Sequence, residues 1–176
     1  MGSDALPKIT LRYHGLFDFD GLYAAVIDWA KNEGFIWHEK AYKHKVPSPA
    51  GAEQEIDWEI SKNVTEYIKY TILFTLHIWD LLEVEVDADG KKKTLSNARI
   101  YIIINGTITT DWQGRFEKGS RFAQMLGKWY NKTVNPVEQM YFDQLYYRIW
   151  NLHAIIKKYF DMQTKKYAYK GYLGEG

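Results

Sequence analysis

Histidines and carboxylates are the residues of this sequence whose spacing could support catalysis or metal binding. The chain has five histidines and no cysteine, so disulfides, thiolate metal sites and cysteine nucleophiles are excluded. No two histidines have the spacing of a local metal motif. His38 and His44 are expected to share a strand face about 20 Å apart, because a strand rises ~3.3 Å per residue, too far to bind one metal. We expect no catalytic residue, no metal site and no cofactor, although a site built from residues distant in sequence stays open.

A row of carboxylates follows one face of the strand that we predict around residues 53–60. Glu55, Asp57 and Glu59 alternate with apolar residues, and this period of two directs the two sets to opposite faces. Carboxylates in a row could perturb one another's pKa values and serve acid–base chemistry. We favour a solvated strand face instead, with lysine or arginine side chains of a neighbouring strand opposite the acids.

The stretch HEKAYKHK combines positive charge with an aromatic ring, which is the chemistry of single-stranded nucleic acid binding. Its candidate contact residues are His38, Lys40, Tyr42, Lys43 and Lys45. The net charge of only +1 does not attract a phosphate backbone strongly. RNA contact is therefore a weak second alternative, and nucleic acid is not an expected partner.

The stretch YFDQLYYRIWNLHAIIKKYFD, residues 141–161, is more apolar and aromatic than an ordinary surface helix. Its apolar residues form two adjacent rows that are together wider than the ~100° stripe of a helix resting on a core. The second row could pack in the core, line a cavity against the sheet, or be covered by a second chain. In the cavity interpretation His153 is a polar anchor for the ligand. The ligand-binding residues would then be Tyr70, Phe74, Tyr146, Trp150 and His153.

The remaining pattern predicts a single α+β domain over residues 1–164, followed by a flexible tail over 165–176. Alternation predicts strands near residues 8–14, 35–45, 53–60, 67–79 and 98–112, with a tight hairpin at DADG. Helical spacing predicts helices over 19–33, 122–130 and from Asn135 to about Thr164. Helices at both ends of an antiparallel meander indicate a curved sheet with helices on one face.

This order of elements resembles the helix-grip families, in which a long C-terminal helix lies across a strongly curved antiparallel sheet. The resemblance covers most of the chain, but it is topological and departs in having one N-terminal helix where those families often have a pair. It implies an apolar ligand pocket between helix and sheet. The runs GLFDFDGLYAAVIDWA and DQLYYRIWNLHAIIKKYFD also resemble uncharacterised archaeal proteins, which implies no activity.

We therefore expect a non-catalytic binding module for an apolar small molecule, with an apolar and aromatic pocket between the long helix and the sheet. The main alternative is an interaction protein that meets a protein partner or copies of itself through exposed aromatic residues, which make up 16% of the chain. We expect no secretion signal, because MGSDALPKIT has neither a basic nor an apolar segment of that kind, and no apolar run is long enough to span a membrane. We expect a cytoplasmic protein.

Overall fold

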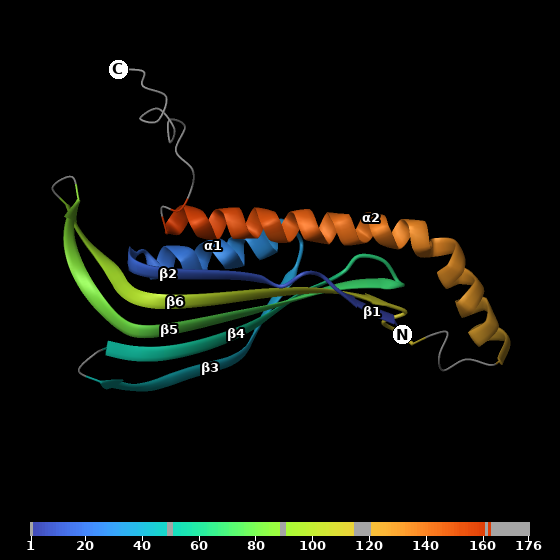
Figure 1. Ribbon diagram of the computed structural model, residues 1–176, viewed down its shortest axis with the longest axis horizontal. Coiled ribbons are helices and arrows are strands. Elements are labelled where there is room, and N and C mark those ends of the chain that lie inside the picture. The colour runs from blue at the N-terminus through green and yellow to red at the C-terminus, as the bar shows by residue number, and fades with distance from the viewer. Residues whose placement is uncertain (1, 49–50, 89–90, 115–120, 161, 163–176) are drawn as a thin grey trace, which may run out of the picture.

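The computed structural model describes residues 2–48, 51–88, 91–114, 121–160 and 162. Both helices lie on the same side of one curled antiparallel sheet (Figure 1), which confirms the α+β arrangement. The expected tail over 165–176 lies outside the described residues. In chain order the elements are β1 (Gly2–Ala5), β2 (Ile9–Phe17), α1 (Phe19–Asn32), β3 (Ile36–Ser48), β4 (Gly51–Asn63), β5 (Ile68–Ala88), β6 (Lys91–Thr110) and α2 (Arg121–Tyr159).

The sheet is built around β5 and β6, which pair along almost their whole length from Ile68 opposite Thr110 to Ala88 opposite Lys91. On one side the order continues through β4 to β3. On the other side β1 and β2 both pair with β6, one after the other along it. All pairs are antiparallel, and the sheet is curled but open, with β3 at one edge and β1 and β2 at the other.

Two sequence predictions of separate elements are wrong. The strand predicted to end near residue 79 continues through a β-bulge to Ala88, so the hairpin at DADG is the end of the two long strands. The helices predicted over 122–130 and from Asn135 are one helix, α2. Pro136 removes one backbone donor but does not stop the helix, which bends in its N-terminal half (Figure 1).

The helix predicted over 19–33 is confirmed as α1, and its ends follow the expected local chemistry. The Asp18 side chain accepts a hydrogen bond from the Gly21 amide at 2.9 Å and caps the N-terminus. Gly34 has a positive φ of 72° after the last turn, a conformation that glycine adopts without strain. The chain can therefore turn at once into β3.

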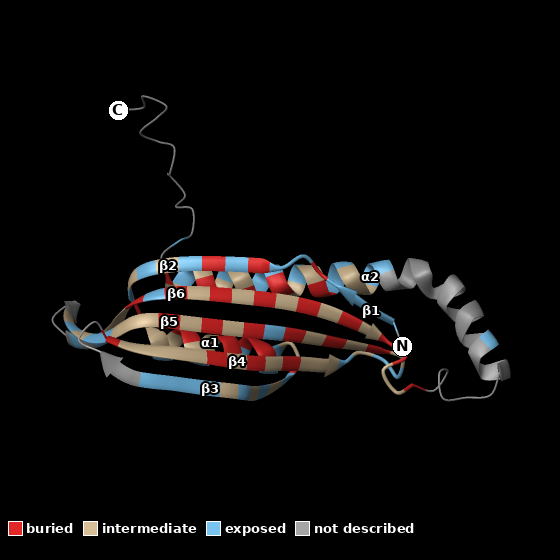
Figure 2. Ribbon diagram, turned by 60° about the horizontal axis from the view of Figure 1, so that its bottom comes forward, coloured by how far each residue is buried: buried red, intermediate tan, exposed pale blue. Residues whose placement is uncertain are grey.

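The core lies between the sheet and the two helices. Alternate residues of β4, β5 and β6 are buried toward the helices (Figure 2). From α2 the buried residues are Leu145, Ile149, Leu152 and Ile156. They belong to one of the two apolar rows predicted for this helix, and that row rests on the sheet. The indole of Trp29 on α1 donates to Asn151 Oδ1 at 3.0 Å and joins the helices. Among the described residues, no helix has both the length and the hydrophobicity needed to cross a bilayer.

Gly106 allows α2 to approach the sheet closely. A side-chain carbon at this position of β6 would overlap Ile149 Cδ1 and would also contact Leu145 and Leu6. A larger residue would therefore push α2 away from β6 or force side chains out of their preferred rotamers.

We predict that Gly106→Ala lowers the free energy of unfolding by about 1–3 kcal/mol, as overpacking does elsewhere. Ile149→Val removes the overlapping Cδ1 atom and by itself should cost about 0.5–1.5 kcal/mol. The double variant should lose less stability than the sum of the two single variants, because the second substitution makes room for the first. Urea denaturation of the four proteins tests this, and strict additivity would contradict the proposed contact.

Candidate functional site

Tyr70 and Phe74, predicted to line a pocket, lie within the packed core. Each is 1% exposed. Phe74 stacks on Trp58 with ring centroids 5.2 Å apart, and the Tyr70 hydroxyl donates to the Tyr141 carbonyl at 2.9 Å. Burial raises the pKa of Tyr70 to about 12. Tyr70 therefore serves as a neutral hydrogen-bond donor between sheet and helix.

The other three predicted pocket residues lie together on one flank of α2. Tyr146 contacts Trp150 edge to face, and Trp150 contacts His153 in the same way, at centroid distances of 6.0 and 5.0 Å. Trp150 is 41% exposed, so this flank is open to solvent in the described structure. Partial burial, and then Lys157, lower the pKa of His153. The structure brings these three residues together, and of the three Tyr146 packs partly against the core that contains Tyr70 and Phe74.

The basic and aromatic stretch in β3 is divided between the two faces of the sheet. A bulge between Glu39 and Ala41 adds one residue and reverses the alternation of faces. His38 pairs with Glu59 on the solvent-facing side, which we call the outer face, whereas His44 pairs with Gln54 on the opposite face. The prediction that His38 and His44 share a face is wrong for this reason.

The bulge likewise separates Tyr42 from the lysines. Tyr42 pairs with the buried Ile56, but Lys43 pairs with Glu55 on the outer face. A base stacked on Tyr42 would therefore lie on the opposite side of β3 from Lys43. The two groups that nucleic acid binding needs together are not on one surface.

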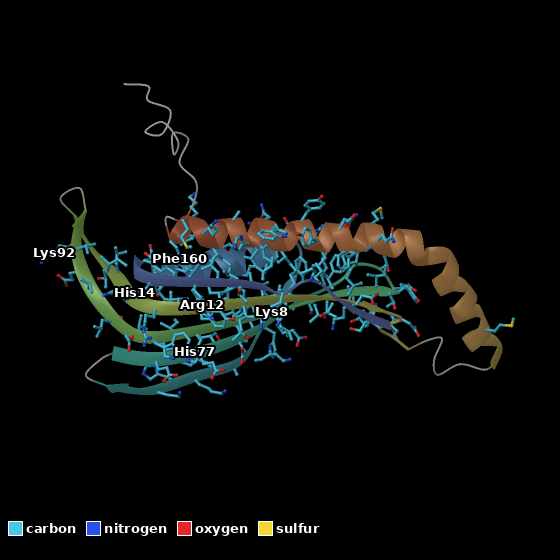
Figure 3. The ribbon with its side chains drawn as sticks, viewed as in Figure 1. Lys8, Arg12, His14, His77, Lys92 and Phe160 are labelled. Carbon is cyan, nitrogen blue, oxygen red and sulfur yellow. The ribbon has the colours of Figure 1, made fainter. Side chains whose placement is uncertain are left out.

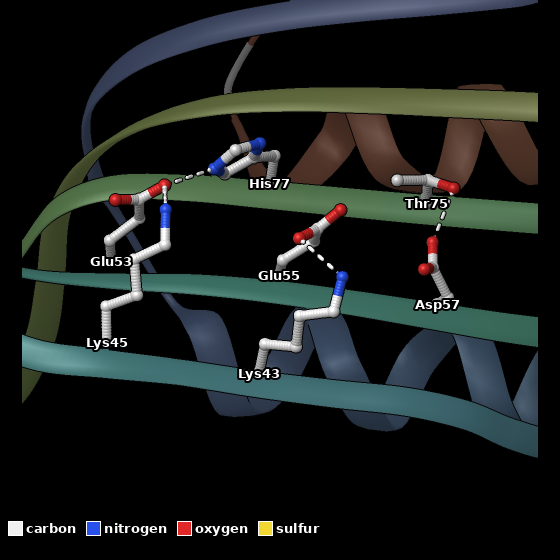
Figure 4. A network of polar contacts seen from close by, with 7 residues as sticks. All are labelled: Lys43, Lys45, Glu53, Glu55, Asp57, Thr75 and His77. Atoms are coloured by element: carbon white, nitrogen blue, oxygen red, sulfur yellow. Dashed lines mark hydrogen bonds and ion pairs between the residues drawn. The ribbon is translucent and has the colours of Figure 1, made fainter.

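The carboxylates of β4 form cross-strand pairs on the outer face, as predicted. Lys40, Lys43 and Lys45 of β3 meet Glu59, Glu55 and Glu53 at 2.8, 3.2 and 2.8 Å. Figure 4 shows the Lys43–Glu55 and Lys45–Glu53 contacts together with the hydrogen bond from Thr75 to Asp57 and the 2.8 Å contact between Glu53 and His77. The positive charge of this half of the outer face is therefore balanced by neighbouring carboxylates.

The other half of the outer face carries six side chains: two arginines, two histidines, a tyrosine and a tryptophan. Cross-strand pairing of β5, β6 and β2 aligns them in two rows, and paired residues project on the same face of a sheet. We call these six side chains the outer array. Figure 3 labels two of them, Arg12 and His14, along β2. Its first row is His77, Tyr101 and Arg12, and its second row is Trp79, Arg99 and His14.

Ring contacts hold the two guanidinium groups of the outer array. Arg12 Cζ lies 4.9 Å from the centre of the Tyr101 ring, and Arg99 Cζ lies 6.0 Å from that of Trp79. The Trp79 ring also stacks on His77 at 3.8 Å. An arginine stacked on a ring keeps its N–H groups available at the edge of its plane, where they suit phosphate or carboxylate oxygens.

A bulge in β5 shapes the array. The register shifts between Trp79 and Leu82, and Asp80 adopts a positive φ of 57°. The Asp80 carboxylate accepts a 2.5 Å hydrogen bond from Arg99 Nε. Bulges bend a strand and redirect its side chains, and beyond this one the β5–β6 hairpin curves toward the helices (Figure 1). The outer array therefore lies at the bend of the sheet.

An open hollow of about 480 Å³ lies at this bend. Arg12, Tyr13 and His14 line it from β2, Trp79 from β5, and Arg99, Ile100 and Tyr101 from β6. Its volume is within the range of small-molecule sites. A second hollow of about 560 Å³ lies between α1 and α2, beside Trp29 and Asn151. Neither hollow is lined by any of the five residues predicted to bind an apolar ligand.

The sequence contained a partial signal for the outer array. Arg12 and His14 alternate with apolar residues in the sequence, as do His77 and Trp79, and a period of two predicts each pair on the less apolar side of its strand. The missing information was that β2 pairs with β6, more than 80 positions later, in a register that sets His14 opposite Arg99. No local pattern encodes such a pairing.

Comparison with known proteins adds no functional assignment, because no protein-family model matches the chain and no curated protein is significantly similar to it. Within the described ranges, no three histidine or acidic side chains are grouped so that they could hold a metal ion.

We predict that Lys45→Met raises the pKa of Glu53 toward its ordinary value. The hydrogen bond from Lys45 is the largest cause of the lowered pKa, and the contact with His77 is the next. Because that pKa is depressed in the folded protein, the Glu53 carboxylate favours folding above its ordinary pKa, and this contribution is lost as the pH falls through the lowered value. Carbon-detected NMR titration of the carboxyl group measures the change.

Lys43→Met is the matched control, since Lys43 pairs with Glu55 rather than Glu53. It should leave the titration of Glu53 unchanged. Equal shifts in both variants would mean that general surface charge, not the Lys45 contact, sets this pKa.

Proposed function

We propose that the protein is a binding module that holds an anionic ligand on the outer array. The observation that carries this proposal is the position of Arg12. Its guanidinium is stacked on Tyr101, and within the described part of the chain neither Arg12 nor His14 pairs with a carboxylate. Arg99 and His14 are directly opposite each other in the second row of the array, so a second guanidinium and an imidazole lie in the row next to Arg12.

The contrast between the two halves of the outer face supports this choice. On β3 and β4 each of three lysines meets a glutamate, so an incoming anion would have to displace a protein carboxylate. On β2 and β6 the only carboxylate contact of the two arginines is that of Arg99 with Asp80, among the described residues. An anion would therefore gain hydrogen bonds there without breaking an existing ion pair of Arg12.

The outer array is also better suited to a ligand than the interface between α2 and the sheet. Tyr70 and Phe74 are fully packed by protein side chains, so an apolar ligand would have to displace part of the core. The hollow at the array is open to solvent and already has its cationic groups in place. Binding there requires little rearrangement, which lowers its free-energy cost.

Calorimetric titration of the full chain with inorganic pyrophosphate tests the proposal. Arg12→Met should weaken binding at least about tenfold, because a hydrogen bond to a charged group contributes about 1.5–3 kcal/mol and 1.4 kcal/mol corresponds to a factor of ten. Arg12→Lys should restore only part of the affinity, since lysine keeps the charge but lacks the planar set of donors.

The control is Lys43→Met, which removes a cation from the same cross-strand series but from the half already paired with glutamate. It should bind pyrophosphate as the unmodified protein does. Absence of binding by the unmodified protein, or equal losses in Arg12→Met and Lys43→Met, would overturn the proposal.

A further inference from the structure

We infer that the ligand of the outer array is a mononucleotide, whose phosphate meets the guanidinium groups and whose base lies against the rings. This inference rests on the proposed function and adds to it that the anionic ligand also carries a planar base. Its basis is that the array supplies two different chemistries at adjacent positions. Two guanidinium groups lie beside an indole, a phenol and two imidazoles across three strands.

The hollow is larger than a phosphate group needs. Its volume of about 480 Å³ is lined by the rings of Trp79 and Tyr101 as well as by the cations. A bare inorganic anion would satisfy the arginines but would leave most of this space to water. A planar, anionic ligand fills both parts, since bases stack on aromatic side chains and their phosphates suit arginine.

The surroundings of the array indicate a short ligand rather than a nucleic acid strand. Across β5 the lysines of β3 are already paired with Glu53, Glu55 and Glu59 of β4, so that half of the face has no unpaired lysine among these three for further phosphates. On the same face, the next cross-strand pair beyond His77 and Tyr101 is Thr75 and Ile103. Neither of these residues carries a charge. On this side of the array the cationic surface therefore ends, which favours a ligand with few phosphates.

The decisive comparison is between AMP and ribose 5-phosphate, which share the phosphorylated sugar and differ in the base. Calorimetric titration at fixed ionic strength should give an affinity for AMP about tenfold higher, because stacking of a base contributes roughly 1–3 kcal/mol. Trp79→Phe should keep most of this preference, since it keeps an aromatic face. Trp79→Leu should reduce it to about twofold or less.

The possible outcomes separate this inference from the proposed function. If pyrophosphate and ribose 5-phosphate bind as tightly as AMP, the array is an anion site without base recognition, and only the inference fails. If none of the three ligands binds, both the inference and the proposed function fail. If a 12-nucleotide single strand binds far more tightly than AMP, with an affinity that falls steeply with salt, the ligand is a strand and the mononucleotide is excluded. Arg12→Met should weaken AMP and ribose 5-phosphate binding equally, and a selective loss of AMP would contradict the assigned role of the guanidinium.

Discussion

The register between β5 and β6 is the constraint on which the other features of the structure depend. Because side chains alternate along a strand, this one register directs Phe74 and Ile104 into the core and leaves His77 and Tyr101 on the outer face. A slip of one residue would exchange the two faces of the strand. The buried face is almost entirely apolar, so such a slip would expose it, and the cost of that exposure fixes the position of the outer array.

Local periodicity was sufficient to predict the core but not the site. The rows of α2 and the alternation of β4 follow from residue spacing, and α1 from its Asp18 cap. Bulges were not predictable in the same way, because the pattern of residues does not show where one strand has an extra residue relative to its partner. Such a residue nevertheless reverses the faces of the side chains that follow it. The bulge in β3 separated Tyr42 from its lysines, and the bulge in β5 shaped the hollow beside Trp79.

The outer face illustrates how neighbouring strands decide whether a charge is available. Lys43 and Arg12 belong to the same cross-strand series, and each is a cation on an exposed strand at an edge of the sheet. Lys43 faces a glutamate and is neutralised, whereas Arg12 faces Tyr101 and keeps its charge. The functional difference between the two residues therefore lies in their partners.

The two open edges of the sheet carry exposed basic side chains. β3 exposes Lys40, Lys43 and Lys45 at one edge, and β2 exposes Arg12 and His14 at the other. An open edge has unpaired backbone groups that can recruit another strand, and positive charge along it opposes such pairing. A strand added at either edge would have to accommodate these exposed lysine and arginine side chains, so the same residues that give the sheet its surface chemistry also disfavour edge-to-edge aggregation at high concentration.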